Sequence, residues 1–264
     1  SNLGLFFYLR FLQPNAVALP ATGNCPTRAS LTQQELDTVL SNLHSPEQRL
    51  WQSLTWEQGA ILLACPELVN LLYHWQTQAK QRASLSIRIR ELITLLTHKA
   101  VNAARWLQGE MDELAQNLEL FFTPASSGLL SINQFEVAIA QLKHQGIDIP
   151  NQVRPTYQNI NLDGIPLRLC ALVWSVASEI SPPQWSLLLI LGTQTGDSLP
   201  DDLKLQVSNL TGILQEPISD LDDQFLFAHV EGDWSEKFVV TIVPLDCPPL
   251  MLSPYTFEPE QAPN

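Results

Sequence analysis

The sequence lacks the motifs that most enzymes and nucleotide-binding proteins require. It contains no GxGxxG or GxxxxGK[ST] phosphate-binding loop, no GxSxG nucleophile elbow and no HExxH metal motif. The histidines share no HxxxH or cysteine-paired spacing: they are His44, His74, His98, His144 and His229. We therefore expect a protein that is not an enzyme and that needs no cofactor.

Cysteine is also scarce. The four cysteines are spread over the 264 residues as Cys25, Cys65, Cys170 and Cys247. None forms a CxxC pair, so the spacing excludes zinc-finger and thioredoxin-like chemistry and favours buried, reduced thiols. A basic start followed by an apolar run and a small-residue cleavage site is missing, and the expected compartment is the cytoplasm.

Long apolar runs are absent as well. A membrane-spanning helix needs about 20 apolar residues, whereas the apolar segment from Leu3 to Leu12 is only ten residues long, includes Arg10 and stops before Gln13-Pro14. We interpret this segment as a core-packing helix or strand, or as a trimmed remnant, followed by an irregular connector up to residue 29. Three more short runs, within Ile165 to Val207, are separated by Pro, Ser, Gly and Asp, which is typical of strands in a sheet core.

Positive charge is nearly missing from the second part of the chain. Residues 156–264 hold 3 Lys/Arg against 15 Asp/Glu, whereas residues 1–155 hold 11 against 12, and the whole chain carries a net charge of −13. Such an acidic surface repels phosphate backbones and attracts basic proteins. Nucleic-acid binding by the second part is therefore not expected, and a basic protein partner is.

The first part of the chain has a helical pattern. Three capping boxes, Thr32 with Glu35, Ser45 with Gln48 and Thr55 with Gln58, predict three short helices. Apolar residues that recur three and four positions apart predict one long helix from Ser84 to Phe122, bent near Gly109. We expect an all-helical domain over residues 30–146.

From residue 147 the pattern changes to short β-strands. Runs of alternating apolar residues between turn signals predict an antiparallel β-sandwich, Ig-like or jelly-roll-like, over residues 147–257, with a disordered tail at 258–264. Trp174 and Trp185 are expected between its sheets. The predicted strands are Val153–Ile160, Ile165–Ala177, Trp185–Thr193, Leu203–Asn209, Ile213–Ile218, Phe225–Val230, Phe238–Val243 and Leu250–Leu252. The expected fold class is therefore α+β, a helical domain followed by an acidic sandwich.

Two charged groups are candidate binding sites. Acids cluster between the predicted strands, and these residues are candidates for docking a basic protein: Asp197, Asp201, Asp202, Asp220, Asp222 and Asp223. Carboxylates on loops also suit calcium, which makes Asp220, Asp222 and Asp223 weak metal candidates. Basic residues gather on the predicted long helix, and they are the candidates for docking DNA or the acidic part: Arg88, Arg90, Lys99 and Arg105.

Four phrases in the second part resemble a known family. They are GIDIP at 146–150, PLRLCALVW at 166–174, the run from Trp185 to Gly212, and EKFVVTI at 236–242. Over about residues 130–257 the chain resembles a cyanobacterial family of unknown function, whose genes are associated with sigma-factor-like regulators. No catalytic residues are described for that family. The resemblance therefore implies a lineage and no catalytic role for any residue.

These observations favour a non-enzymatic, cytoplasmic regulatory or protein-interaction module that binds a basic, transcription-related protein. Two alternatives stay open. The chain could be a DNA-binding regulator of cyanobacterial cell differentiation that uses the basic helices at 80–105. It could also be a calcium-binding or hydrolytic domain that uses the acidic loops. The sequence indicates no membrane association and does not determine the oligomeric state.

Overall fold

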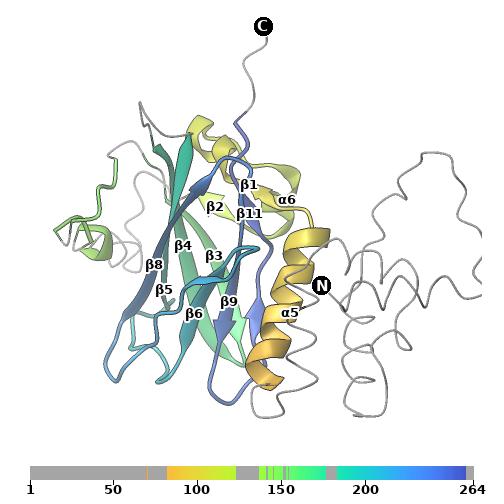
Figure 1. Cartoon of the computed structure of the whole chain (residues 1–264). Helices are drawn as coiled ribbons and strands as arrows, with labels where there is room; N and C mark the ends of the chain where they lie inside the picture. Colours follow the sequence, from red (N-terminus) through yellow and green to blue (C-terminus); the bar gives the residue numbers. More distant parts are fainter. Residues whose placement is uncertain are drawn as a thin grey trace, which may run out of the picture. The chain divides into compact units, whose positions relative to one another are not determined.

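The computed structural model describes residues 70, 82–122, 137–140, 142–144, 146–150, 153, 155–176 and 183–259. The chain divides into two compact units, residues 1–97 and residues 98–264. The main described element of the first unit is the helix α5 (Arg82–Thr97), and the second unit holds all the described strands. Figure 1 shows those strands as two layers.

Helix α5 follows the apolar spacing of the sequence. Ile89, Leu92, Ile93 and Leu95 are buried, in keeping with a stripe at helical spacing. Near the end of the helix the Thr97 hydroxyl donates a hydrogen bond to the Ile93 carbonyl at 2.8 Å. The chain then leaves the helical path, and the first described strand begins four residues later, at Val101.

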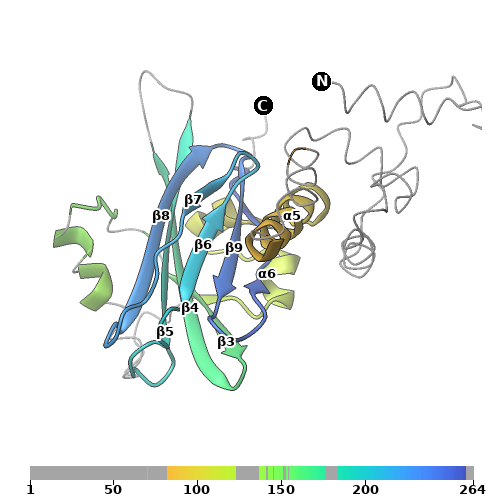
Figure 2. The ribbon, with the colours of Figure 1, turned by 60° about the horizontal axis from the view of Figure 1, so that its bottom comes forward.

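The described strands form two sheets of mostly antiparallel pairs. The first sheet has the order β1-β11-β9-β6-β7, with β10 also paired to β9, and Figure 2 shows β7, β6 and β9 side by side. Its strands are β1 (Val101–Asn102), β6 (Lys204–Ser208), β7 (Ile213–Gln215), β9 (Lys237–Val243), β10 (Leu250–Met251) and β11 (Tyr255–Thr256). The second sheet has the order β2-β3-β4-β5-β8. Its strands are β2 (Phe121–Phe122), β3 (Thr156–Leu162), β4 (Ile165–Val176), β5 (Gln184–Thr193) and β8 (Phe225–Asp233).

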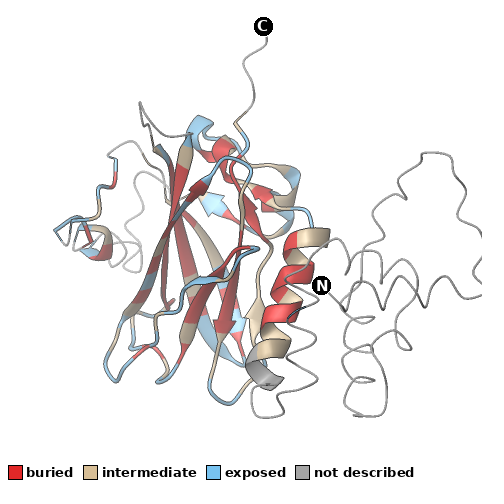
Figure 3. Cartoon of the chain, viewed as in Figure 1, coloured by how far each residue is buried: buried red, intermediate tan, exposed pale blue. Residues whose placement is uncertain are grey.

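The main core combines side chains from both sheets. Alternate residues of β8, from Leu226 to Val230, are buried in the same cluster as those of β6 and β9. Trp185 is fully buried there, with its ring centroid 4.9 Å from that of Phe238 and 5.7 Å from that of Phe257. Figure 3 shows this buried layer in red along the strands.

One side of the sandwich is closed by two short helices. The 3-10 helix η3 (Ala103–Gln108) and the helix α6 (Glu113–Asn117) connect β1 to β2, which are outer strands of the two sheets. Trp106 of η3 enters the core and meets Tyr255 edge to face, with ring centroids 6.0 Å apart. Asn102 and Asp112 cap the two helices by accepting hydrogen bonds from Ala104 N–H and Ala115 N–H.

The outer face of the second sheet carries a separate apolar cluster. Ala138, Leu142 and Ile149 pack with the outward-facing residues of β4 and β5. Trp174 belongs to this outer cluster, so its expected place between the sheets is wrong, whereas that of Trp185 is right. Burial in this cluster raises the pKa of the Cys170 thiol to about 12, because the thiolate would be desolvated. Cys170 is thus an inert core residue.

The predicted all-helical domain is wrong for the part of it that the structure describes. The helix expected from Ser84 to Phe122 ends at Thr97, and the remainder forms β1, η3, α6 and β2. Apolar residues three and four positions apart are also compatible with a 3-10 helix and a short α-helix that pack on a sheet. This spacing alone therefore does not establish one long helix. Gly109, the expected bend, instead ends η3 in the left-handed region at φ 78°. The three capping-box helices before residue 60 lie outside the described residues.

The expected β-rich second part is confirmed: β3 to β10 begin and end close to the predicted positions, whereas β11 was not predicted. In the described portion of the chain, no helix combines the length and the apolar character that crossing a membrane requires.

Candidate functional site

The sheet topology brings four connections to one end of the sandwich. These connections are the β3–β4 turn and the β5–β6, β7–β8 and β9–β10 loops. In the second sheet, β5 ends opposite the start of β4, and β8 starts opposite the end of β5. In the first sheet, β6 starts opposite the end of β9. We call this the acidic end, since eight aspartates are placed on these connections. They are Asp163, Asp197, Asp201, Asp202, Asp220, Asp222, Asp223 and Asp246.

The two predicted acid clusters are joined by hydrogen bonds. Leu199 N–H donates to the Asp223 carbonyl at 2.7 Å, and Asp202 N–H donates to the Ser219 carbonyl at 3.1 Å. The buried Ser219 hydroxyl donates to the Pro200 carbonyl at 2.5 Å. The β5–β6 and β7–β8 loops therefore form one unit, and all six predicted docking aspartates lie on it.

Some of these aspartates also shape their own turns. Asp163, Asp202 and Asp222 have positive φ angles of 50°, 55° and 74°, a region that Asp and Asn adopt more readily than most residues. Asp223 accepts a hydrogen bond from Asp220 N–H at 2.8 Å. Asp197 accepts one from the Thr195 hydroxyl at 2.6 Å. The loops thus position the carboxylates of Asp197 and Asp223 by hydrogen bonds within their own turns.

The calcium candidates Asp220, Asp222 and Asp223 do not converge. A calcium ion wants six to eight oxygen ligands, and within the described ranges no three His, Cys, Asp or Glu side chains form a group that could hold a metal ion. The Asp223 carboxylate faces its own loop rather than a shared centre. The arrangement fits an extended charged surface better than a metal cage.

Few basic side chains neutralise the aspartates of the acidic end. Lys204 is the one Lys or Arg between residues 194 and 224 in the sequence. Its ammonium lies 3.9 Å from the Glu216 carboxylate, and both side chains are 37% exposed. Exposed pairs of this kind contribute little to stability and leave the surrounding potential negative.

An apolar strip borders the acidic end. The side chains of Ile213, Leu214, Ile218 and Leu221, on β7 and the loop after it, are 50%, 39%, 44% and 80% exposed. We call these four residues the β7 strip. Exposed apolar residues that occur singly need no explanation, but four of them within the short segment 213–221, beside charged loops, mark a candidate interaction surface.

The four predicted basic site residues do not share one helix. Arg88 and Arg90 lie on α5 in the first unit, whereas Lys99 and Arg105 lie in the second. Arg88 is buried, and its guanidinium lies 3.3 Å from the equally buried carboxylate of Glu91. A guanidinium used in this way is withdrawn from DNA, so the structure does not favour the basic-helix alternative.

Histidine chemistry is present at one place on the outer face of the second sheet. The Nε2 atom of His229 lies 2.6 Å from the hydroxyl of Ser186 and 4.0 Å from the carboxylate of Glu231, and its ring stacks on Trp174 at 5.5 Å. Desolvation lowers the pKa of His229, although Glu231 opposes this shift. Sequence reasoning missed Ser186, because its place beside His229 depends on the pairing of β5 with β8.

This group does not form a serine hydrolase triad. Both the serine and the carboxylate approach the same ring nitrogen, whereas a triad needs the carboxylate on the opposite one. Ser186 is also fully buried near the start of β5, between β4 and β8, so a substrate has no access to its hydroxyl. We interpret the group as a structural hydrogen bond.

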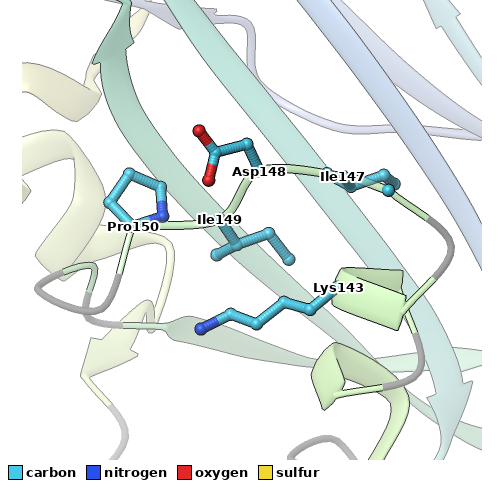
Figure 4. A pocket seen from close by; sticks show the side chains of 6 residues that line it. Lys143, Ile147, Asp148, Ile149 and Pro150 are labelled. Carbon is cyan, nitrogen blue, oxygen red and sulfur yellow. The ribbon is translucent and has the colours of Figure 1, made fainter.

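Two surface hollows are weaker candidates. One of about 460 Å³ is formed by Lys143 and residues 146–150, and Figure 4 shows its side chains along one stretch of chain. A second of about 470 Å³ adjoins Lys99 and Arg105. In the second, Asn102 and Asp112 are already occupied with helix capping, and the first draws on a single local segment. The second hollow is lined by further charged side chains, among them Lys99, Arg105 and Glu113, but both hollows stay weaker candidates than the acidic end.

Two aspartates of the acidic end were not among the docking residues predicted from the sequence. Asp163 lies in the hairpin turn and Asp246 follows β9, and each is isolated from the clusters along the chain. The NLDG turn at 161–164 was the available signal for the first, since a hairpin turn places its residues at one end of a sheet.

Comparison with known families identifies a match over most of the chain. A model for a family described as protein of unknown function (DUF1822) matches residues 4–247, which extends well before the segment where the resemblance was expected. No curated protein matches the chain.

Proposed function

The chain belongs to this family of unknown function, and from the geometry of the acidic end we propose that it is a non-enzymatic regulatory module that binds a basic protein. The observation that carries the proposal is the gathering of eight aspartates on four connections at one end of the sandwich. Charges concentrated in this way raise the encounter rate with an oppositely charged partner and select against acidic ones.

The class of partner follows from the same charges. Proteins that bind nucleic acids carry surplus Lys and Arg, which makes a transcription-related protein a suitable occupant. The resemblance to a cyanobacterial family with sigma-factor-like gene neighbours supports this choice. We place the interaction in the cytoplasm. Direct DNA binding by the acidic end is not favoured, because its carboxylates repel phosphates.

The proposal is tested by the salt dependence of association. The tagged full chain is used to capture partners from its native cells, and the association rate of the captured protein is then measured at 0.05 to 1 M salt. The Debye length falls from about 10 Å at 0.1 M to about 3 Å at 1 M, so rates set by surface charge should fall steeply over this range.

The test variant is Asp220→Asn, Asp222→Asn and Asp223→Asn in one chain. Asn tolerates the positive φ of residue 222 and keeps an acceptor for the Asp220 N–H, so the loop should stay folded. We expect association at low salt to slow by about tenfold and its salt dependence to flatten.

A matched control removes three other charges. Glu110→Gln, Glu113→Gln and Glu119→Gln change the net charge equally, and these exposed residues lie on the connection between β1 and β2. The control should associate like the wild type. Equal rates and salt slopes in all three proteins would show that the acidic end only solvates its loops.

A further inference from the structure

Among the described residues, strand β7 is an edge of the first sheet: it pairs with β6 alone, and all three of its side chains are exposed. Its contact with the second sheet is made by a side chain, because the Gln215 carboxamide oxygen accepts a hydrogen bond from His229 N–H of β8 at 2.9 Å. The opposite side of the sandwich is different, because η3 and α6 fill the space beside β1 and β2 there. Edge strands offer unpaired N–H and C=O groups to another chain, and natural proteins usually shorten, charge or cover them.

The backbone groups along this edge can be assigned. Leu205 N–H donates to the Pro217 carbonyl and Ser219 N–H donates to the Leu203 carbonyl, so residues 217 and 219 face β6. In an antiparallel ladder the intervening residues face the other way. The N–H and C=O groups of Glu216 and Ile218 therefore point outward, and within the described chain no hydrogen bond occupies them.

Pro217 does not remove a hydrogen-bond donor from the outward side of this edge. Pro217 lacks an N–H group, but its position in the ladder faces β6, where its carbonyl alone is used. The outward edge keeps the donors of Glu216 and Ile218 on either side of it. Apolar side chains of the β7 strip lie along the same stretch, with Ile218 44% exposed.

Charge selects the occupant of the edge. Residues 197–223 contain seven acids and one base, so they attract a basic segment. A second copy of the chain would bring its own acids and a net charge of −13 to the same place, which opposes edge-to-edge pairing. A strand in which basic and apolar residues alternate matches both the carboxylates and the β7 strip.

We propose that the edge from Leu214 to Ile218 accepts an extended basic segment of the partner protein as an additional β-strand of the first sheet. This inference rests on the proposed function and specifies how the partner is held. The acidic end speeds the encounter, the Glu216 and Ile218 backbone groups provide pairing, and the β7 strip receives alternate apolar side chains.

The probe for this proposal is the capped octapeptide (Lys-Val)4, used with the full-length chain. Binding is measured by fluorescence anisotropy, and amide hydrogen exchange is followed by NMR. We expect the peptide to bind and to slow exchange at the Glu216 and Ile218 N–H groups by about tenfold, because each gains a hydrogen bond. Two peptide controls separate charge from pairing. They are (Glu-Val)4 and (Lys-Val)4 with every backbone nitrogen methylated, and neither should protect these amides.

Two protein variants test the backbone directly. Ile218→Pro removes one outward donor and leaves the β6 pairing of residues 217 and 219, whereas Ile218→Ala shortens the same side chain and keeps the donor. Peptide affinity should fall about tenfold for Ile218→Pro, and it should fall clearly less for Ile218→Ala. The methylated peptide serves as an independent test if the proline variant does not fold.

The outcomes separate this inference from the proposed function. Equal binding of the methylated and unmethylated peptides would mean that charge alone holds the partner, which rejects strand addition and leaves the proposed function standing. Failure of (Lys-Val)4 to bind, with the captured partner still showing salt-dependent association, leads to the same conclusion. Concentration-dependent dimers that protect β7 would overturn it in favour of a second copy. Loss of all salt-dependent association would reject both proposals.

Discussion

The thiol of Cys247 donates a hydrogen bond to the carboxylate of Asp163 at 3.1 Å, although the two residues are 84 positions apart in the sequence. The contact joins the β9–β10 loop to the β3–β4 turn, and so links the two sheets at the acidic end. It also raises the pKa of the Cys247 thiol, mainly because ionisation would lose this hydrogen bond and would place a second negative charge beside Asp163.

Cys247 should therefore react slowly for a surface thiol. The thiolate is the reactive form, so a raised pKa reduces alkylation at pH 7 to 8. Asp163→Asn should speed the modification of Cys247, and Asp246→Asn, which removes only a neighbouring charge, should have a smaller effect. Iodoacetamide labelling followed by mass spectrometry resolves each cysteine. Equal rates in all three proteins would show that the contact with Asp163 does not form in solution.

His229 should make stability depend on pH in the weakly acidic range. Its pKa in the folded chain lies below the ordinary value of 6.5, because burial beside Trp174 disfavours the charged ring. The unfolded chain therefore binds the proton more readily, and the stabilisation from His229 is complete above 6.5 and is lost as the pH falls toward the folded-state pKa.

The measurement is the free energy of unfolding from pH 5 to 8 for the wild type and for His229→Gln, which cannot titrate. The difference between the two should stay constant above pH 6.5 and change in favour of the variant below it. The opposite trend would mean that Glu231 outweighs burial and raises the pKa of His229 instead.

Gly232 should not tolerate even a methyl group. A Cβ atom there would lie 2.5 Å from the Phe238 ring and 2.5 Å from the Glu236 carboxylate, and Phe238 is fully buried against Trp185. Gly232→Ala should cost about 1–3 kcal/mol in denaturant unfolding, as overpacked cores do. Gly212→Ala is the matched control, since its Cβ would meet nothing within 4 Å, and it should leave stability close to that of the wild type.

The two strand tryptophans should contribute unequally. Trp185→Ala should cost about 3–5 kcal/mol, because it empties the core between Phe238 and Phe257. Trp174→Ala should cost less, since its ring lies on the outer face beside the partly exposed His229. It should also raise the pKa of His229 toward 6.5 in an NMR titration, because water then reaches the imidazole. Equal losses of stability would place both rings in one core.

The strands of the second unit follow largely from local pattern. The runs predicted at 165–177, 185–193 and 238–243 correspond to β4 (Ile165–Val176), β5 (Gln184–Thr193) and β9 (Lys237–Val243). Their apolar residues are continuous or alternating, and turn residues bound them, so each segment carries its own signal. The exposed edge of β7 is signalled only in part, since Ile213 and Leu214 look like core residues.

The segment after α5 carries no such signal. Val101 and Asn102 form a strand because β11 is beside them, and Asn102 exchanges hydrogen bonds with Glu258, 156 residues away. A helical spacing of alanines gives no hint of a neighbour so distant in sequence. The acidic end is likewise predictable only in part. The two aspartate clusters are visible in the sequence, but the strand topology decides that Asp163 and Asp246 lie at the same end of the sandwich.

The parallel pairing of β1 with β11 has a consequence for synthesis. Tyr255 and Thr256 lie between β1 and β9 in the first sheet, so β1 gains its described neighbour in that sheet only after residues 255–256 have been synthesised. During translation, Trp106 lacks its ring contact with Tyr255, and Trp185 lacks its ring contact with Phe257. Long-range pairings of this kind fold slowly and leave apolar surface uncovered in the meantime. We therefore expect the nascent chain to depend on chaperones until β11 has been synthesised.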